Sequence, residues 1–153
     1  MILSTICYIE KDNKYLMLHR TKKEKDINKN KWIGVGGKIE EGESPEECIE
    51  REVKEETGLT LKKYRLRGII TYTSTTCEAD YMYLFSANDF EGELIECNEG
   101  DLKWVEKDNI MNLNLWEGDK IFLEKLLKED NSLFTIKFEY DGDKLLRYTI
   151  NEY

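Results

Sequence analysis

The stretch GGKIEEGESPEECIEREVKEETGL, residues 36–59, specifies a helix between two turns. Ser44 suits the N-cap position, Pro45 suits the first helical position, and Glu47 completes a capping box with Ser44. Gly58 supplies the left-handed residue at which many helices end. A helix is therefore predicted from Pro45 to the residue before Gly58, within the usual boundary error of a residue or two.

Nine of the 24 residues in this stretch are glutamates, and three of them share an arc of the predicted helix with apolar side chains. At 3.6 residues per turn, this arc of about 100° holds Glu52, Glu55, Glu56, Cys48 and Ile49. Clustered carboxylates beside an apolar stripe repel one another and lose hydration, which raises their pKa values. Basic side chains from elsewhere in the fold or a hard divalent cation would compensate them. From spacing alone, a charged helix side near the surface is the favoured explanation.

The opposite side of the predicted helix carries acids that need no special partner. Glu47 precedes Arg51 by four residues, and Glu50 precedes Lys54 by the same interval. This order, acid first, is the favourable orientation for an ion pair on a helix. We expect both pairs on the solvent side.

Length and composition favour one soluble domain over residues 1–153. Of its 153 residues, 40% are hydrophobic and 36% are charged, which suits a globular chain with a real core. No apolar run is long enough to span a membrane. The N-terminal residues alternate like a strand and lack the basic start of a signal peptide. A cytoplasmic location is therefore expected.

The formal net charge of −9 argues against nucleic acid or anionic membrane as a partner. An acidic protein still binds phosphates when a divalent cation lies between them. The four cysteines are far apart and form no CxxC pair, so free thiols are expected. The oligomeric state cannot be read from the sequence, and a monomer is the simpler expectation.

Hydrophobic periodicity predicts more strand than helix in the rest of the chain. The expected elements are a first hairpin (2–10 and 14–20), a polar solvated loop (21–31), strands at 63–75, 79–87 and 102–105, an amphipathic helix (117–129), and a final hairpin that turns at Asp141-Gly142.

The glutamate-rich stretch also resembles the signature of a known family. Its fixed positions are Gly37, Glu43, Arg51, Glu52, Val53, Glu55, Glu56, Gly58 and Leu59. Their identities and spacing reproduce the Nudix box without a departure. By this resemblance the chain is identified as a Nudix hydrolase of the MutT-like branch. The resemblance implies an α+β (mixed α/β) fold, with an α/β/α sandwich built around a mixed β-sheet.

The resemblance also implies a Mg²⁺ site, for which Mn²⁺ is an alternative cation. The implied ligands are Glu52, Glu55, Glu56 and the carbonyl oxygen of Gly36. In this family the metal binds the diphosphate of the substrate, neutralises its charge and activates water.

Four other positions of the box are implied to hold its shape. Glu43 and Arg51 would pair with each other, while Gly37 and Gly58 would serve the backbone turns. The general base varies within the family. Glu52 is the first candidate by similarity, and Glu99, in the loop GELIECNEGDLKW, is the second. Glu99 could equally be an ordinary loop acid.

The segment KWIGVGGK and the C-terminal half resemble the branch that hydrolyses oxidised purine nucleoside triphosphates. This resemblance implies that Trp116 stacks on the base and that Asp119 hydrogen-bonds the edge of the base. Lys38 could contact a phosphate or simply be solvated. A core aromatic followed by an acid in the first turn of a helix is the structural alternative for Trp116 and Asp119.

Two positions depart from the pattern of that branch. Ile33 stands where the branch often has a base-reading asparagine, and Gly118 stands where it has a second aspartate. A pocket with fewer buried hydrogen-bonding groups discriminates less strongly between bases.

The expected function is Mg²⁺-dependent hydrolysis of a nucleoside triphosphate to a monophosphate and pyrophosphate, with oxidised purine nucleotides such as 8-oxo-dGTP as substrates. The partner is thus a small-molecule nucleotide. Two alternatives stay open. One is hydrolysis of another nucleoside diphosphate derivative, such as ADP-ribose, a dinucleotide or an RNA cap. The other is a non-catalytic nucleotide-binding sensor.

Overall fold

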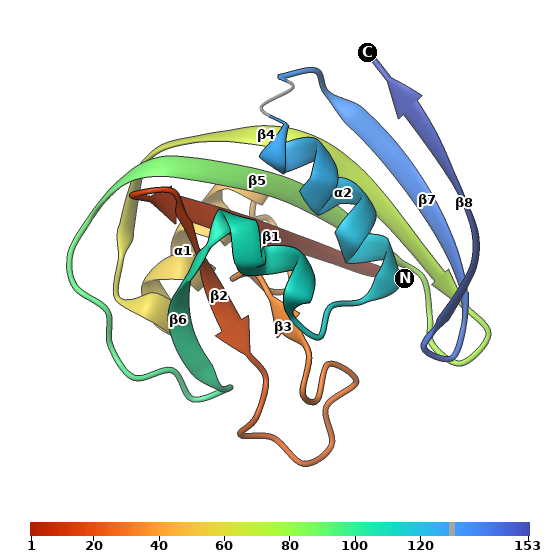
Figure 1. The fold of residues 1–153 in the computed structure, drawn as a ribbon, viewed down its shortest axis with the longest axis horizontal. Coiled ribbons are helices and arrows are strands. Elements are labelled where there is room, and N and C mark those ends of the chain that lie inside the picture. Colours follow the sequence, from red (N-terminus) through yellow and green to blue (C-terminus); the bar gives the residue numbers. More distant parts are fainter. Residues whose placement is uncertain (129–130) are drawn as a thin grey trace.

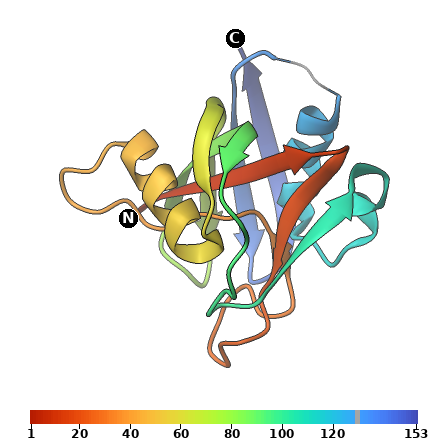
Figure 2. The ribbon, with the colours of Figure 1, turned by 90° about the vertical axis from the view of Figure 1, so that its left-hand side faces the viewer.

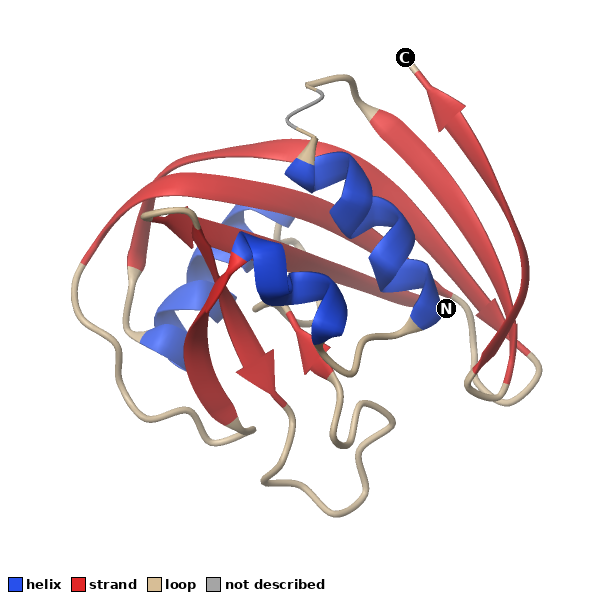
Figure 3. Ribbon diagram, viewed as in Figure 1, coloured by secondary structure: helices blue, strands red, loops and turns tan. Residues whose placement is uncertain are grey.

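The computed structural model describes residues 1–128 and 131–153. Strands dominate this part of the chain, as the sequence predicts (Figure 3). The elements, in order, are β1 (Ile2–Lys11), β2 (Lys14–His19), β3 (Trp32–Ile33), α1 (Pro45–Thr57), β4 (Thr60–Ser74), β5 (Asp80–Glu91), β6 (Asp101–Glu106), the 3-10 helix η1 (Lys107–Asn112), α2 (Glu117–Leu127), β7 (Phe134–Asp141) and β8 (Lys144–Glu152). Neither described helix is long and apolar enough to cross a membrane.

The strands form a mixed sheet in which β1, β5, β4, β7 and β8 lie side by side (Figure 1). β1 runs parallel to β5, and β4 runs parallel to β7, while the other neighbours are antiparallel. β2 pairs with β1 only beside their shared turn, at Glu10–Tyr15 and Lys11–Lys14. It then diverges and pairs with β3 and β6.

The two α-helices cover opposite sides of the strands, with α1 on one side and α2 on the other (Figure 2). Alternation along β1 explains why both faces are covered. Ile6 and Tyr8 are buried in the same cluster as Phe122 of α2. Cys7 and Ile9, which point to the other face, are buried in the cluster that contains Ile49 of α1. The predicted α/β/α sandwich with a mixed sheet is confirmed.

The two hairpins turn through backbone conformations that their residues favour. In the first, Asp12 and Asn13 have φ values of 52° and 60°, which asparagine and aspartate tolerate well. In the second, Asp141 pairs with Lys144, so the two loop residues are Gly142 and Asp143. The predicted turn at Asp141-Gly142 is therefore wrong by one residue, because Asp141 is still paired in the ladder.

Other differences concern short elements and element ends. α2 ends at Leu127 with its C-cap at Lys128, earlier than the predicted end, and position 129 lies outside the described residues. The two-residue strand β3 and the helix η1 lie in segments that the sequence analysis did not assign to any strand or helix. Both are too short to produce a clear periodic pattern.

Candidate active site

α1 begins and ends at the residues that its capping signals indicate. The Ser44 hydroxyl accepts the Glu47 backbone N–H at 3.0 Å, and the Glu47 carboxylate accepts the Ser44 N–H at 3.0 Å. Gly58 has a left-handed φ of 82° and donates its N–H to the Lys54 carbonyl. Both ends of the helix are thus determined locally, and its acidic side faces the bend at Gly36-Gly37.

Arg51, on α1, holds the loop that precedes the helix through Glu43. Its Nε and Nη2 atoms donate to the two carboxylate oxygens of Glu43 at 2.7 and 3.0 Å, a bidentate pair. This hydrogen bonding is the main reason that the pKa of Glu43 falls to about 2. Nη1 donates to Glu52 at 2.7 Å and to Glu55 at 3.3 Å. The implied pairing of Glu43 with Arg51 is thus present in the geometry.

The two ion pairs expected on the other side of α1 are not found among the described residues. The Glu47 carboxylate accepts the N-cap N–H of the capping box instead. The Lys54 ammonium donates to the Gly58 carbonyl at 3.2 Å, where it meets the negative end of the helix dipole. Local hydrogen bonds to the backbone therefore replace pairs that spacing alone predicted.

The bend before α1 is closely packed on both sides. A Cβ atom on Gly36 would lie 2.0 Å from the backbone oxygen of Thr5, and a Cβ atom on Gly37 would lie 2.4 Å from Cδ of Glu52. The Gly37 carbonyl accepts the Thr5 N–H at 2.8 Å. The absence of side chains allows this bend to lie against β1 and against the Glu52 carboxylate together.

Glu56 is a buried acid with one oxygen left unsatisfied. Its Oε2 atom is buried and has no hydrogen-bond partner within the described part of the chain. Burial, followed by the charges of Glu99 and Glu52, raises the pKa of Glu56 well above its ordinary value. An uncompensated acid of this kind calls for a cation or a bound proton.

Glu99 lies close enough to Glu56 for its charge to raise the pKa of Glu56, although Glu99 comes from the loop between β5 and β6. Its carboxylate accepts hydrogen bonds from Arg20 at 2.9 Å and from Lys23 at 3.1 Å. Two basic residues thus hold this acid beside Glu56. The sequence could not choose between this position and an ordinary solvated loop acid.

A cavity of about 540 Å³ extends from the bend at Gly36-Gly37 to the start of α2. Lys38 lines it beside the bend, and Trp116 and Asp119 line it at the far end. Its other lining residues include Ser4, Ile6, Arg20, Asn28, Ile33, Tyr72, Asp80 and Met82. The residues implied for phosphate and base thus border one continuous space, which Gly36 alone of the implied metal ligands also lines.

Asp119 is almost completely buried, with 3% of its surface exposed. It accepts a hydrogen bond from the Tyr72 hydroxyl at 2.6 Å. Burial raises the pKa of Asp119 to about 7, although the Tyr72 hydrogen bond and the charge of Lys31 oppose the increase. This carboxyl group therefore gains or loses its proton near neutral pH.

Trp116 is held at the N-terminus of α2 by its surroundings. Its Nε1–H donates to Oδ1 of Asn28 at 2.7 Å, and its ring lies nearly perpendicular to the Tyr140 ring, with the centroids 5.7 Å apart. The Lys31 ammonium lies 4.9 Å from the ring centroid. The indole is thus anchored at its polar edge while it lines the cavity.

Comparison with known proteins agrees with this geometry. Residues 2–126 match the family model described as the NUDIX domain. The chain belongs to the Nudix hydrolase family. This Nudix hydrolase is 30% identical over 157 residues to the uncharacterized Nudix hydrolase YvcI of Bacillus subtilis, an alignment that spans 96% of this chain and 92% of the relative.

The branch within the family is also shown. The Nudix hydrolase is 30% identical to the oxidized purine nucleoside triphosphate hydrolase of Mus musculus, over 85% of this chain and 83% of the relative. The crystal structure of a MutT protein from Bacillus halodurans superposes with a TM-score of 0.88 at 30% identity, covering 99% of this chain and 98% of the other. The protein is therefore a Nudix hydrolase of the MutT-like type.

Members of this family generally need a divalent metal ion, and the acids of this chain suit one. Glu52 and Glu56 lie together, and the orphaned Oε2 of Glu56 offers a free ligand oxygen. Glu55 is 60% exposed and pairs with Arg51. Over residues 1–128 and 131–153, no three His, Cys, Asp or Glu side chains already converge as a metal site. The Glu52–Glu56 pair therefore needs further oxygens, for which the Gly36 carbonyl, water and phosphate are candidates.

The departure at Gly118 has a structural reason in this Nudix hydrolase. A Cβ atom at this position would lie 2.7 Å from the Tyr140 hydroxyl and 2.9 Å from the Phe138 ring. The Gly118 N–H donates to the same hydroxyl at 2.7 Å. Tyr140 therefore occupies the space that an aspartate side chain would need.

The other two tryptophans pack against aromatic rings outside the cavity lining. Trp32 stacks on His19 with ring centroids 4.3 Å apart, and Trp104 stacks on Phe90 at 5.8 Å. Neither is among the residues that line the cavity.

Sequence reasoning missed several residues that shape this site. Arg20, Asn28, Tyr72 and Tyr140 line the cavity or hold its lining residues. Asn28 lies in the loop 21–31, which was expected to be a solvated connection. One local signal was available there, because the spacing Asp26-x-Asn28 suits an Asx turn. The Asn28 N–H does donate to Oδ1 of Asp26 at 3.0 Å.

Proposed function

We propose that this Nudix hydrolase is a Mg²⁺-dependent pyrophosphohydrolase that acts in the cytoplasm. It converts a nucleoside triphosphate into a monophosphate and pyrophosphate, and it prefers oxidised purine nucleotides such as 8-oxo-dGTP. One observation supports this proposal above all. The cavity of about 540 Å³ is bordered by Gly36, Gly37 and Lys38 as well as by Trp116 and Asp119. In this proposal one nucleotide places its phosphates beside the glycine bend and its base beside Trp116.

At the phosphate end, the bound metal ion supplies charge neutralisation and lowers the pKa of water. In this proposal Glu52, Glu56 and the Gly36 carbonyl would hold it, with Glu55 as a further ligand from the exposed side of the helix. Arg51 donates to Oε1 of Glu52 and so orients this carboxylate. Glu52 is the first candidate for the group that accepts a proton from water, and Glu99 is the second. Lys38, at the edge of the cavity, receives the phosphates.

At the base end, Trp116 stacks on the purine while Asp119 hydrogen-bonds its edge. Asp119 can accept a hydrogen bond when ionised and donate one when protonated, and its pKa of about 7 makes both forms accessible. Stacking on an aromatic ring does not distinguish one base from another, whereas a buried carboxyl group does. With Gly118 in place of a second acid, we expect preference for oxidised purines but not exclusivity.

The test is release of pyrophosphate or phosphate from 8-oxo-dGTP, dGTP, ATP, ADP-ribose and NADH with Mg²⁺, using Glu56→Gln as the inactive control. Preference for 8-oxo-dGTP, lost in the control, supports the proposal. Activity confined to ADP-ribose or NADH contradicts the purine assignment and keeps the metal mechanism. Nucleotide binding without any hydrolysis would favour the sensor alternative.

A further inference from the structure

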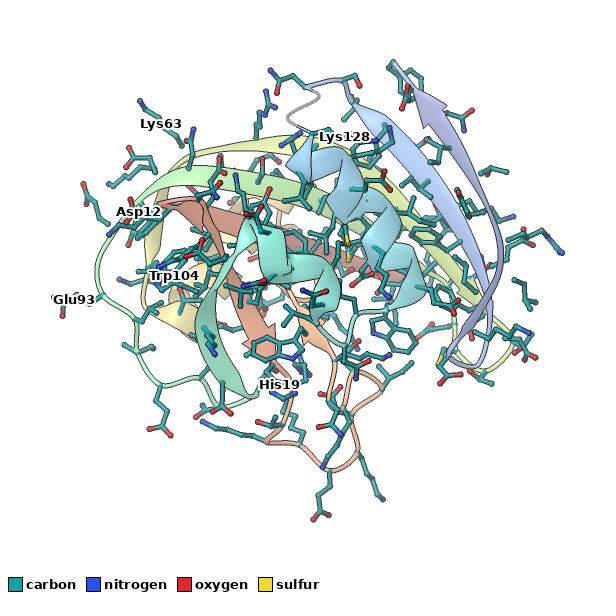
Figure 4. All side chains as sticks on the ribbon, in the orientation of Figure 1. Asp12, His19, Lys63, Glu93, Trp104 and Lys128 are labelled. Atoms are coloured by element: carbon teal, nitrogen blue, oxygen red, sulfur yellow. The ribbon has the colours of Figure 1, made fainter. Side chains whose placement is uncertain are left out.

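Arg20 joins two loops that approach the candidate active site from different parts of the chain. It follows His19, which ends β2 where the loop 21–31 begins (Figure 4). Its Nε donates to Oδ2 of Asp26 at 2.7 Å, and its Nη1 donates to Oε2 of Glu99 at 2.9 Å. The Arg20 side chain is 14% exposed and the Asp26 side chain is 5% exposed. One nearly buried guanidinium thus holds both acids.

The contacts of Asp26 continue this connection towards the base end of the cavity. Its second oxygen, Oδ1, accepts the Asn28 N–H at 3.0 Å. The Asn28 side-chain oxygen then accepts the Trp116 indole N–H at 2.7 Å. Glu99, a candidate general base, is therefore connected to Trp116, the candidate base-stacking residue, through an unbroken series of hydrogen bonds. We call this series, Glu99–Arg20–Asp26–Asn28–Trp116, the tether.

Backbone contacts keep the Glu99 end of the tether in place. The Lys22 N–H donates to the Glu99 carbonyl at 3.3 Å. A Cβ atom on Gly100 would lie 1.8 Å from the His19 carbonyl oxygen, so the two backbones touch there. Both Asp26 oxygens are occupied, and a nearly buried charge is costly to leave without its partner. The loop 21–31 is therefore held in one arrangement relative to Glu99.

We infer that Arg20 and Asp26 are positioning residues that couple the base-binding end of the cavity to Glu99. The tether fixes the indole of Trp116 relative to the acids of the box, so the base and the reacting phosphates are aligned together. This inference rests on the proposed function only in assigning the base to Trp116. The tether itself exists without nucleotide.

The test compares Asp26→Asn with Glu24→Gln, which makes the same acid-to-amide change at an exposed position of the same loop. In ¹⁵N-labelled protein without nucleotide, Asp26→Asn should shift the Trp116 indole N–H resonance and speed its exchange with water. Glu24→Gln should change neither. Trp116→Phe assigns the resonance by removing it.

A double-mutant cycle supplies the kinetic readout. Asp26→Asn should raise KM about 5- to 10-fold in the natural background, the range of one lost hydrogen bond. In the Trp116→Phe background, which lacks the indole N–H, the same change should raise KM less than about 2-fold. Equal effects in both backgrounds, or an indole resonance unmoved by Asp26→Asn, would overturn the inference.

Asn28→Ala covers the case in which Asp26→Asn does not fold, because it leaves the Arg20–Asp26 pair intact and breaks only the bond to the indole. The same shift in the resonance and the same dependence on Trp116 are expected from it. The proposed function can fail independently of this inference. In that case the indole resonance still responds to Asp26→Asn, but the protein does not cleave oxidised purine triphosphates.

Discussion

Gly37 lies directly against the carboxylate of Glu52, so that a Cβ atom at position 37 would be 2.4 Å from Cδ and 2.6 Å from both oxygens. The obstructing atoms belong to the end of a side chain, which can rotate away. Position 36 is different, because its Cβ atom would meet the backbone oxygen of Thr5 at 2.0 Å. The two adjacent glycines therefore have different roles. Gly37 leaves room for the Glu52 carboxylate, a catalytic candidate, and Gly36 lets the backbone of the bend lie against Thr5.

Gly37→Ala should fold but lose activity. We expect a loss of less than about 1 kcal/mol in the free energy of unfolding, because only Glu52 must move. Activity should fall about 100-fold, since small displacements of a reacting group are costly. Urea unfolding and pyrophosphate release measure the two effects. Gly36→Ala, the matched comparison, should instead lose several kcal/mol of stability. Full activity in Gly37→Ala would show that the position of Glu52 is unimportant.

Glu56→Gln should abolish the stabilisation of the protein by Mg²⁺. A ligand that binds only the folded state raises the melting temperature, and the wild type should show this rise. Glutamine lacks the charge that the buried cluster offers to a cation. The variant should therefore melt at the same temperature with and without Mg²⁺. Differential scanning fluorimetry at several Mg²⁺ concentrations provides the measurement.

The control for this experiment is Glu50→Gln, an exposed acid on the same helix. It should keep the Mg²⁺-dependent rise in full. If Glu56→Gln also kept it, the metal would have to bind elsewhere.

Asp119 should make the protein less stable as the pH rises. An aspartate in an unfolded chain titrates near pH 3.9, whereas the pKa of Asp119 is about 7 in the fold. Between these values the folded state binds more protons, so stability falls by about 1.4 kcal/mol per pH unit through this group. Asp119→Asn, which can still accept the Tyr72 hydrogen bond, should lose this dependence.

Urea unfolding at pH 5, 6, 7 and 8 tests the prediction. The difference in stability between Asp119→Asn and the wild type should move in favour of the variant as the pH increases. Asp143→Asn, in the exposed turn after β7, serves as the control and should run parallel to the wild type. Parallel curves for all three proteins would show that Asp119 titrates normally.

Glu43 should show the opposite dependence on pH. Hydrogen bonding from Arg51 lowers its pKa to about 2 in the folded protein. Its contribution to stability is therefore present above about pH 4.5, where a free glutamate is ionised, and is lost as the pH falls towards 2. Glu43→Gln should melt at a lower temperature at neutral pH and lose less stability than the wild type on acidification. Glu41→Gln, an exposed neighbour, should follow the wild type at both pH values.

Local sequence was sufficient wherever the deciding contacts are themselves local. The ends of α1 agree with prediction because Ser44, Glu47 and Gly58 make their capping contacts within a few residues. The first hairpin agrees because Asp12 and Asn13 tolerate positive φ values. The pattern of the box, nine residues with fixed spacing, likewise identified the family before any contact was known.

Tertiary structure alone decided which of these residues are buried and what they meet. Glu55 and Glu56 are neighbours in sequence, yet Glu55 is 60% exposed while Glu56 keeps a buried, unpartnered oxygen beside Glu99. Asn28 meets Trp116, 88 residues later in the chain. Helix periodicity and capping depend on neighbours along the chain, and so they can be read in the sequence. Burial and hydrogen bonds between distant loops depend on how the strands bring those loops together, which no local pattern encodes.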